Sequence, residues 1–431
     1  MSEPSVAVVV LNWNGKEYLT DCLTSLRQQT YSGPRRLVVV DNGSEDGSAS
    51  FVQETFPDVR LIRSSVNLGF SAGNNLAARQ LDTDLIAFIN NDTRADPRWL
   101  EELVTAVTQA PDIASAGGRI LSWDGARVDF AGGGATLTGF GLQFGFGQPA
   151  TGSERERDVL FACGGSMIVK RRPYLEVGGL DDDYFLFYED VDLGWRLWLA
   201  GHRVRYTPRS IVYHHHHGGT RRWEDQKLAV LYERNALYTV YKNYDDEHLA
   251  RVLPAALLLT AERAAALAGV NRTRMPGSNQ CSIPGRSRAD RSTWKKLGES
   301  IRRRGWSGTL RRVLPVAAAR LQIRITRIRA QAARRVAGDR AALPVSQAAI
   351  SRLLALEEFG SNLQALQEKR QAVQRMRRRS DAEIIGLFVA PVDPAFDAPG
   401  FADYHHRVLK AFKLDEWVRE STRRKSPGTD T

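Results

Sequence analysis

Four short apolar runs, each followed by a segment with helical spacing, constrain this chain more than any other feature. The runs cover residues 6–11, 37–40, 59–62 and 85–89. Continuous apolar runs of this length are typical of strands that are buried on both faces, and the segments between them place apolar residues three and four apart. This order of elements predicts an α/β fold with a doubly wound, mostly parallel sheet and flanking helices.

Charge divides the 431-residue chain into two parts. Residues 1–250 hold 25 Lys and Arg against 33 Asp and Glu, a net charge of −8, whereas residues 251–431 hold 35 against 16, a net charge of +19. An abrupt change of this kind indicates two functional parts. We expect one domain over 1–250, a linker or mobile loop over 251–300, a basic helical region over 301–420 and a disordered tail over 421–431.

The cysteine count and the hydropathy pattern limit where such a chain can work. The three cysteines, Cys22, Cys163 and Cys281, form no C-x-x-C pair, which argues against a disulfide framework or a cysteine zinc cluster and favours a reducing compartment. No apolar stretch approaches the roughly 20 residues of a membrane span. The chain opens without the basic segment of a signal peptide. We expect a cytoplasmic protein that does not cross a membrane.

Polar side chains follow three of the predicted strands. They are Asn12, Asp41 with Asn42, and the Asn90-Asn91-Asp92 group. Ligands of parallel sheets bind beyond the carboxyl ends of the strands. The first turn lacks G-x-G-x-x-G and the chain has no G-x-x-x-x-G-K-[ST], which disfavours a dehydrogenase and a P-loop enzyme. A carboxylate such as Asp92 can instead bind Mg²⁺ or Mn²⁺ and bridge a diphosphate, whereas an isolated Asp41 also fits a turn or cap.

Two further segments each allow two interpretations. The Asn- and Gly-rich stretch 67–75 can wrap a nucleotide or form a loop with a helix N-cap. Gly164-Gly165-Ser166 lies between two apolar runs, where paired glycines permit a ligand to approach the backbone or mark a β-bulge.

Three acids and a histidine run supply candidate chemistry. Glu189, Asp190 and Asp192 fall at a predicted helix N-terminus, whose dipole favours negative charge. The aromatic stretch 184–188 precedes them, and an apolar wall raises a carboxyl pKa toward the range of a general base. The four histidines at 214–217 follow a predicted strand, so that alternation directs His214 and His216 to one face, as metal-binding imidazoles would require.

These motifs, in the order in which they occur along the chain, resemble those of glycosyltransferase family 2. The branch that they resemble is rhamnosyltransferase-like. The resemblance extends over residues 1–245. The matching stretches are 8–15, 38–47, 67–75, 88–92, 162–166, 178–201 and 208–219.

The resemblance implies a GT-A fold, inverting transfer from a nucleotide-sugar donor, and a role for each motif. It implies that Asp41 contacts the base, that Asp92 binds the metal, and that the Glu189-Asp190 pair supplies the catalytic base, by analogy Asp190. The donor site would comprise Asn12, Asp41, Asn42, Asn67, Gly69, Asn74, Asn90 and Asn91. The acceptor site would comprise Gly164, Gly165, Ser166 and Tyr188. The metal site, for Mg²⁺ or Mn²⁺, would comprise Asp92 with His214 or His216, and the proline spacing favours His214.

Several alternatives follow from departures from the family pattern. Asn90 and Asn91 stand where relatives often have Asp, so metal-free catalysis with Arg or Lys is an alternative. We expect transfer of rhamnose or another hexose to a hydroxyl of a glycan or a polyprenyl-diphosphate-linked acceptor in cell-surface polysaccharide synthesis. The rival functions are a nucleotidyltransferase and a non-catalytic, basic-tailed binding protein.

The basic back half allows three interpretations. Residues 310–336 place apolar side chains on one helical face with arginines around it. This pattern fits a helix on an anionic membrane surface, at the inner face of the cell membrane, or a helix packed on the first domain. Nucleic-acid binding is disfavoured because no recognition motif accompanies the charge. A further polar and basic helix is predicted over 348–379, and the oligomeric state is not predicted.

Overall fold

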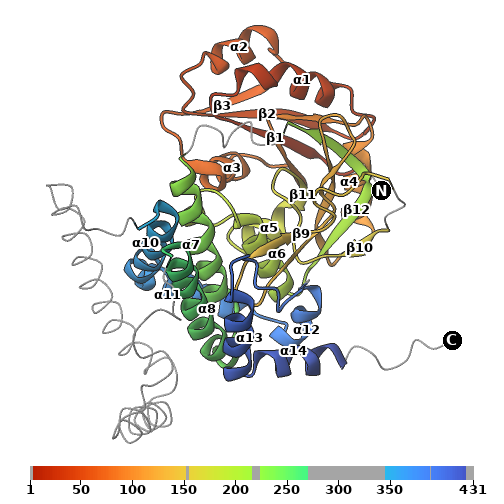
Figure 1. Cartoon of the computed structure of the whole chain (residues 1–431). Coiled ribbons are helices and arrows are strands. Elements are labelled where there is room, and N and C mark those ends of the chain that lie inside the picture. The colour runs from red at the N-terminus through yellow and green to blue at the C-terminus, as the bar shows by residue number, and fades with distance from the viewer. Residues whose placement is uncertain (1–2, 152–154, 216–223, 270–344, 389, 424–431) are drawn as a thin grey trace, which may run out of the picture. The chain divides into compact units, whose positions relative to one another are not determined.

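The computed structural model describes residues 3–151, 155–215, 224–269, 345–388 and 390–423 (Figure 1). The chain forms two compact units. The first comprises Met1–Glu224, Arg370–Asp393 and Trp417–Thr431, and the second comprises Asp225–Lys369 and Pro394–Glu416.

The parallel half of the first unit's sheet matches the sequence prediction. Its strands, in spatial order, are β4 (Leu85–Asn90), β1 (Val6–Asn12), β2 (Arg35–Asn42) and β3 (Arg60–Ser64), and all their pairings are parallel. The connecting helices are α1 (Lys16–Arg27), α2 (Ser48–Thr55) and α3 (Gly69–Arg79). In Figure 1, α1 and α2 cover one face of these strands and α3 lies on the other. The expected doubly wound α/β arrangement is confirmed.

The other half of the sheet is mixed. Beyond β4 the order continues with β11 (Ser166–Lys170), β6 (Ile113–Ser122), β12 (Arg203–His214) and β10 (Arg157–Asp158). β11 runs antiparallel to both β4 and β6, whereas β12 is parallel to β6. Two short strands, β5 (Thr93–Ala95) and β7 (Val128–Phe130), pair antiparallel with β12 and β6. The expected parallel character therefore holds for the first four strands, and β11 changes the strand direction beyond them.

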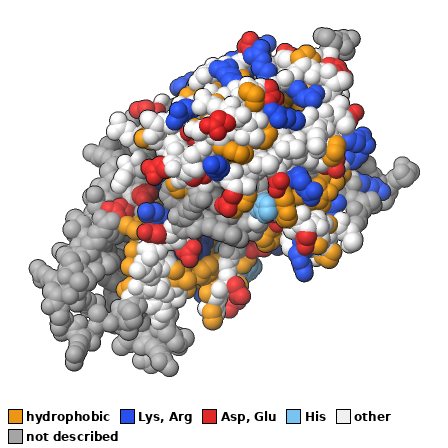
Figure 2. Space-filling model, turned by 90° about the horizontal axis from the view of Figure 1, so that it is seen from above, with side chains coloured by type: hydrophobic (Ala, Val, Ile, Leu, Met, Phe, Trp, Pro, Cys, Tyr) orange, Lys and Arg blue, Asp and Glu red, His pale blue; other side chains and the backbone are white. Residues whose placement is uncertain are grey.

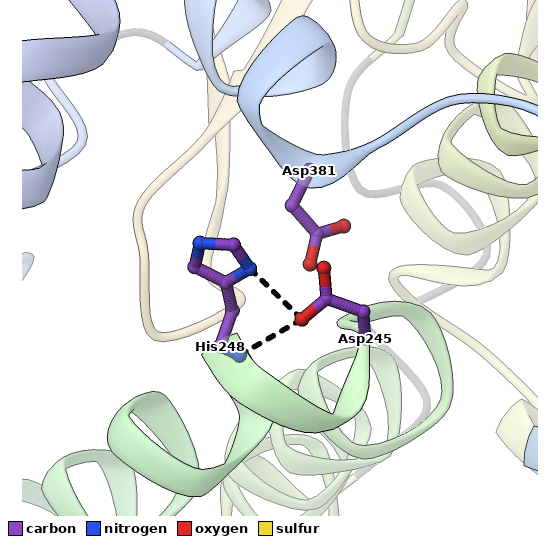
Figure 3. Close-up of side chains that lie close together, drawn as sticks. All are labelled: Asp245, His248 and Asp381. Carbon is purple, nitrogen blue, oxygen red and sulfur yellow. Dashed lines mark hydrogen bonds and ion pairs between the residues drawn. The ribbon is translucent and has the colours of Figure 1, made fainter.

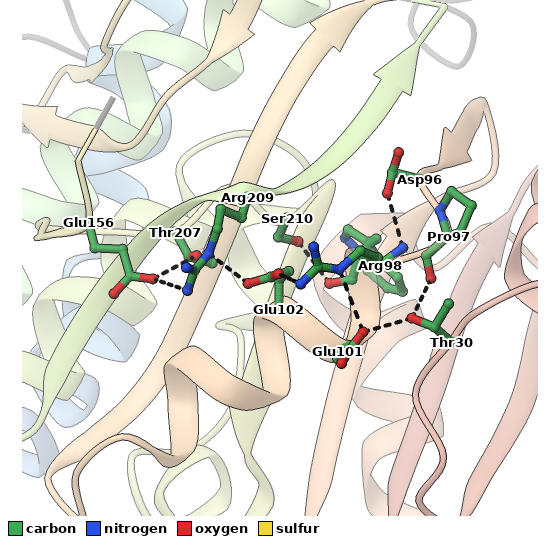
Figure 4. A network of polar contacts seen from close by, with 11 residues as sticks. Thr30, Asp96, Pro97, Arg98, Glu101, Glu102, Glu156, Thr207, Arg209 and Ser210 are labelled. Atoms are coloured by element: carbon green, nitrogen blue, oxygen red, sulfur yellow. Dashed lines mark hydrogen bonds and ion pairs between the residues drawn. The ribbon is translucent and has the colours of Figure 1, made fainter. Parts of the chain in front are cut away.

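A network of polar contacts ties β12 to helix α4 (Trp99–Thr108) (Figure 4). The β12–β6 register shifts between Tyr206 and Ile211, where a bulge frees side chains for other contacts. Arg209 Nε lies 2.9 Å from Glu102 Oε2, and Ser210 Oγ donates to the Trp99 carbonyl at 2.9 Å. These contacts hold the strand that ends at His214.

Helix α6 (Glu189–Leu199) contacts a segment from near the end of the chain. The Leu199 carbonyl accepts from the Arg378 N–H at 2.7 Å, and the Trp195 ring meets Phe388 edge-on at 4.8 Å. Residues 370–393, expected within a separate basic region, thus belong to the first unit. The unit also contains a two-stranded sheet, β8 (Gly133–Ala135) with β9 (Gly141–Gln143), and the short helices α5 (Arg171–Glu176), η1 (Asp182–Tyr184), α12 (Asp381–Ile384) and η4 (Ile385–Leu387).

The second unit is helical. Its main helices are α7 (Asp225–Asn243), α8 (Asp246–Leu267), α10 (Gln347–Ser361) and α13 (Phe401–Ala411). Buried Glu233 on α7 makes a bidentate pair with Arg263 on α8, at 2.8 and 2.7 Å. Asp245 caps α8, accepting from the His248 N–H and lying 2.8 Å from its Nδ1 (Figure 3).

Some sequence predictions for the back half need correction. The single helix predicted over 348–379 is two helices, α10 and α11 (Leu363–Met376), because the chain breaks at Asn362, the C-cap residue of α10. The tail predicted as disordered from 421 is helical through Arg423, the end of α14 (Leu414–Arg423). The predicted amphipathic helix at 310–336 and residues 270–300 of the predicted linker lie outside the described residues. Residues 251–267, predicted to be part of that linker, are instead the C-terminal part of helix α8. Within the described ranges, no helix is both long and apolar enough to cross a membrane.

Candidate active site

The polar ends of β1, β2 and β4 lie side by side. Asn12 pairs with Asp41 across β1 and β2, and Leu11 pairs with Asn90 across β1 and β4. The Asn91 amide donates to Asn12 Oδ1 at 2.7 Å, and the Asn12 amide donates to Ser44 Oγ at 3.3 Å. The sheet thus gathers the predicted donor residues of three strands at one edge, as expected for a parallel α/β sheet.

Asp41 offers an unused acceptor at this edge. Its side chain is only 2% exposed, and Oδ2 lies 3.8 Å from the Arg63 guanidinium. Its Oδ1 is buried and has no hydrogen-bond partner among the described residues. Buried polar atoms are nearly always paired, so this oxygen is a candidate acceptor for a hydrogen bond from a ligand.

Amide side chains hold the loop that enters α3. The Asn42 amide donates to Asn67 Oδ1 at 3.0 Å, and its Oδ1 accepts from the Leu68 N–H at 2.9 Å. Gly69 has φ +80°, and a Cβ there would lie 2.5 Å from the Phe185 ring. Asn74 is buried and donates to the Phe70 carbonyl at 3.0 Å. These predicted donor residues therefore fix the loop that borders the edge.

His214 lies between two carboxylates from different strands. Its Nε2 is 3.3 Å from Asp92 Oδ1, and its Nδ1 is 3.2 Å from Asp129 Oδ2 on β7. Burial lowers the pKa of His214, but the hydrogen-bonding carboxylates of Asp129 and Asp92 more than reverse this and raise the pKa to about 9. The structure thus brings together Asp92 and His214, which the sequence proposed as a pair, whereas His216 lies outside the described residues.

An aromatic stack surrounds the next histidine. The His215 ring stacks on Trp123 with centroids 3.6 Å apart, and the backbone N–H of His215 donates to the Asp92 carbonyl at 3.0 Å. The Arg94 guanidinium lies over both Trp123, at 5.2 Å, and Tyr213, at 4.7 Å. Sequence reasoning missed Asp129, Trp123 and Arg94. The only signal for Asp129 was a single acid between two apolar residues.

Asp190 and Glu189 begin α6. Asp190 is partly exposed; its Oδ2 accepts from the Gly164 N–H at 3.0 Å and its Oδ1 from the Val191 N–H at 2.8 Å. Burial raises the pKa of Asp190 to about 6, against the lowering effect of these hydrogen bonds. Burial and the neighbouring Asp190 charge raise the pKa of Glu189 well above its ordinary value. Asp190 is therefore ionised near neutral pH, and the pKa of its neighbour Glu189 is shifted in the direction that favours the neutral acid.

The backbone before these acids is strained. Phe185, Phe187 and Tyr188 have φ of 63°, 68° and 66°, a left-handed conformation that costs L-residues about 1–3 kcal/mol each. The Tyr188 ring meets Phe140 of the β8–β9 segment edge-on at 6.3 Å. A Cβ on Gly141 would lie 3.1 Å from the same ring. Such strain is typical of functional segments whose geometry the surrounding fold enforces.

Gly164 and Gly165 contact both the strand-end residues and the acids that begin α6. The Gly165 carbonyl accepts from the Asn90 N–H at 3.1 Å, while the Gly164 N–H reaches Asp190. A Cβ on Gly165 would lie 3.0 Å from Asn90 Nδ2, so the close contact requires a small residue. Ser166 is fully buried and its hydroxyl accepts from Trp99 Nε1 at 2.9 Å. Its side chain therefore packs inside the sheet.

Asp192, the third acid of the cluster, has a different environment. It is fully buried and its Oδ2 lies 2.8 Å from both Nε and Nη2 of Arg196, one turn later on α6. The Asp192 carboxylate is therefore paired with a buried guanidinium. This distinguishes Asp192 from Glu189 and Asp190, for which we find no such ion pair among the described residues.

The residues around Asp92 suit a hard divalent cation. Asp92 supplies a carboxylate and His214 an imidazole nitrogen on the same side. Asp129 contacts the other ring nitrogen, the arrangement in which a carboxylate fixes the tautomer of a metal-binding histidine. The donor set therefore fits Mg²⁺ or Mn²⁺.

Comparisons with known proteins identify the class of enzyme to which this sheet edge and these acids belong, the sugar-transferring enzymes. Residues 5–178 match the model of Glycosyl transferase family 2. Glucosyl-dolichyl phosphate glucuronosyltransferase from Haloferax volcanii is 30% identical over 231 residues, covering 48% of this chain and 68% of the relative. The chain belongs to glycosyltransferase family 2, which confirms the family predicted from the sequence.

Other similarities agree with glycan synthesis. N-acetylglucosaminyl-diphospho-decaprenol L-rhamnosyltransferase from Mycobacterium tuberculosis is 29% identical over 254 residues, covering 54% of this chain and 82% of the relative. The crystal structure of GalNAc-T7 with UDP, GalNAc and Mn²⁺ is similar at a TM-score of 0.45 and 14% identity, covering 67% of this chain and 54% of that one. That structural likeness is too low to bear on function.

Proposed function

We propose that this glycosyltransferase inverts the donor sugar, transferring rhamnose or another hexose from a nucleotide-diphosphate donor to a hydroxyl of a glycan or polyprenyl-diphosphate-linked acceptor, in cell-surface polysaccharide synthesis. The observation that carries the proposal is Asp190, a partly exposed carboxylate held by the Gly164 N–H, with its pKa raised to about 6. A base poised near the working pH is the group that such a transfer needs. The acceptor class follows the name of the mycobacterial relative, which acts on a decaprenol-linked substrate.

In the proposed reaction, Asp190 takes the proton of the acceptor hydroxyl as its oxygen attacks the anomeric carbon. A bond forms between that oxygen and carbon, and the bond to the donor diphosphate breaks with its electron pair leaving on the diphosphate. One displacement inverts the anomeric centre. Glu189 favours its neutral form beside Asp190 and so leaves the negative charge on the base.

Donor binding is assigned to the strand-end edge. The unpaired Asp41 Oδ1 would accept a hydrogen bond from the base, and Asn12 and Asn91, already joined to each other, would border the diphosphate. Asp92 and His214 would hold Mg²⁺ or Mn²⁺, which would neutralise charge on the departing diphosphate. Asp129 would keep the His214 ring turned so that Nε2 faces Asp92.

The acceptor side is assigned to Gly164, Gly165 and Tyr188. Gly164 and Gly165 bring the backbone close to Phe70 and Asn90 beside Asp190, and Tyr188 immediately precedes the acids with a fixed left-handed backbone. Buried Ser166 would support this wall from behind.

The test is a panel of nucleotide sugars with a polyprenyl-diphosphate-linked sugar as acceptor, in Mn²⁺ or EDTA. We expect release of a nucleoside diphosphate and a product of inverted anomeric configuration by NMR. Release of pyrophosphate instead would identify a nucleotidyltransferase. Absence of turnover with every donor, together with retained nucleotide binding, would favour a non-catalytic binding protein.

The cellular location proposed is the cytoplasmic face of the membrane. Its support is the net charge of +19 over residues 251–431, since each basic residue near an anionic surface contributes about 1 kcal/mol of attraction. We expect the full chain to co-sediment with anionic liposomes, to ignore neutral ones, and to be released by salt. Equal binding to both kinds of liposome would contradict an electrostatic attachment.

A further inference from the structure

A cavity lies at the opposite end of the strands that carry the candidate active site. It has a volume of about 1190 Å³ and belongs wholly to the first unit. Leu85 and Lys170, paired across the start of β4 and the end of β11, both line it. At the other end of the same two strands, Asn90 meets Gly165. At ~3.3 Å per residue, the two sites are therefore about 15 Å apart along the sheet.

The cavity wall is rich in cations. Six basic side chains line it: Lys170, Arg171, Arg172, Arg375, Arg377 and Arg378. They come from the β11–α5 junction and from the end of α11, which are far apart in sequence. Lys170, Arg171 and Arg172 belong to residues 1–250, whose net charge is −8, and the other three belong to residues 251–431, whose net charge is +19. The face that carries α1 and α2 instead shows both signs of charge interspersed (Figure 2).

Four acids also line the wall, Glu3, Asp82, Asp84 and Glu176, and each contacts another group. Asp82 lies 3.6 Å from the Arg36 guanidinium at the surface. Asp84 accepts from the Ser5 N–H and hydroxyl at 2.8 and 2.7 Å, and Glu3 accepts from the Ser32 hydroxyl at 2.9 Å. Glu176 pairs with Arg172 at 2.8 Å. Among the described residues, no ion pair joins these acids to Arg171, Arg375 or Arg378, and the six basic side chains outnumber the four acids.

Three of the arginines have charge available for a ligand. The Nε of Arg171 is buried without a hydrogen-bond partner, and the side chains of Arg375 and Arg378 make no ion pair, among the residues that the structure describes. His202 also lines the cavity. Burial lowers the pKa of His202, the Glu176 charge opposes this, and the charges of Arg378 and Lys170 lower the pKa further.

We infer that this cavity is a second binding site, for a phosphate-bearing anion, formed by Arg171, Arg375 and Arg378. Guanidinium groups bind phosphate through paired, charge-assisted hydrogen bonds, and arginines converging from two segments suit more than one phosphoryl group. A volume of about 1190 Å³ exceeds what a single phosphate needs and admits a polyphosphate or a phospholipid headgroup. The inference is independent of the proposed transfer, because the two sites share no residue.

The first test uses the full chain with sodium tripolyphosphate in EDTA, which suppresses cation-dependent binding at the candidate active site. Hydrogen exchange should show protection of residues 171–177 and 375–379. Arg375→Gln with Arg378→Gln should raise the dissociation constant about tenfold or more. A matched control, Arg60→Gln with Arg127→Gln, removes two exposed arginines outside the cavity and should change it less than about twofold. Equal losses in both double variants, or no protection of these segments, would overturn the inference.

A second measurement distinguishes the two sources of phosphate. If phospholipid headgroups occupy the cavity, phosphatidylglycerol vesicles should protect the same segments, phosphatidylcholine vesicles should not, and the cavity variant should lose the protection. If only soluble phosphates bind, vesicles should leave the segments unprotected while tripolyphosphate protects them. Protection by neither probe would show that the cavity binds no phosphate group.

Discussion

The Asp129 carboxylate lies 3.2 Å from Nδ1 of His214, on the side of the ring opposite Asp92. Asp129 belongs to β7, a three-residue strand at the margin of the sheet, whereas Asp92 follows β4. The pairing of β7 with β6, and of β6 with β12, therefore determines which way the imidazole of His214 faces. A small marginal strand thus contributes to the candidate metal site without supplying a ligand to it.

The first prediction concerns this positioning. Asp129→Ala should weaken Mn²⁺ binding by about 10–100-fold, as loss of a carboxylate behind a metal-binding histidine usually does. Asp129→Asn retains an oxygen acceptor for the Nδ1 hydrogen and should recover part of the affinity. Free Mn²⁺, measured by electron paramagnetic resonance, provides the readout without any turnover. Unchanged Mn²⁺ affinity in the alanine variant would remove Asp129 from the site.

The second prediction separates the cation from the nucleotide base. Asp92→Ala should abolish the part of donor binding that Mn²⁺ adds and leave binding in EDTA unchanged. Asp41→Ala should weaken donor binding in both conditions, because we assign its buried oxygens to the base and not to the cation. Calorimetry with a nucleoside diphosphate measures both effects. If wild-type turnover is the same in EDTA and in Mn²⁺, the metal role of Asp92 and His214 is wrong.

The third prediction concerns the general base. Asp190→Asn preserves shape and the hydrogen bonds from Gly164 and Val191 as far as one oxygen permits, but it cannot take a proton. Turnover should fall about 10²–10⁴-fold while donor affinity stays within about twofold. Single-turnover kinetics measure the loss of turnover, and a donor titration measures the donor affinity. A variant with near-normal turnover would transfer the role to Glu189.

The pKa of Asp190 gives the fourth prediction. Because the base must be ionised, kcat/KM should rise with pH up to about 6 and level off above it.

The stability of the folded protein should change in the opposite direction, falling as the pH rises. A folded pKa raised from 3.8 to about 6 means that the native state holds the proton longer, so stability falls as pH rises through that window. Asp190→Asn should therefore unfold at a higher temperature than wild type at pH 7.5, and this difference should shrink near pH 4. A variant with no such pH-dependent difference would contradict the assigned pKa.

The sequence predicted those features that periodicity and strand ends encode. The runs of β1 to β4 are long enough and apolar enough to identify buried strands, and the polar residues after them had to share one edge. Asp129 could not be identified, since it lies on β7, a three-residue strand whose antiparallel pairing with β6 no local pattern specifies. Trp123 could not be identified either, since it directly follows β6 and its stacking on His215 depends on tertiary structure. The place of residues 370–393 in the first unit was likewise unpredicted, because it depends on tertiary contacts such as that between Trp195 and Phe388. The local pattern also could not distinguish Asp190 from Asp192, which only the family resemblance separated; the buried Arg196 makes them differ in the structure.

That difference gives the last prediction. Asp192 and Arg196 form a buried pair on α6, with 0% and 4% of their side chains exposed. Asp192→Asn leaves the Arg196 charge buried without its counter-charge, which typically costs about 3–5 kcal/mol of unfolding free energy. Arg172→Gln is the matched control: it breaks a pair of the same spacing with Glu176, but at the surface, where such pairs contribute about 0.3–0.5 kcal/mol. Urea unfolding measures both. The folded Asp192→Asn enzyme should keep most of its turnover, because Asp190 is intact. A variant as stable as wild type that has lost turnover would instead make Asp192 the base, and Arg196 the group that holds it.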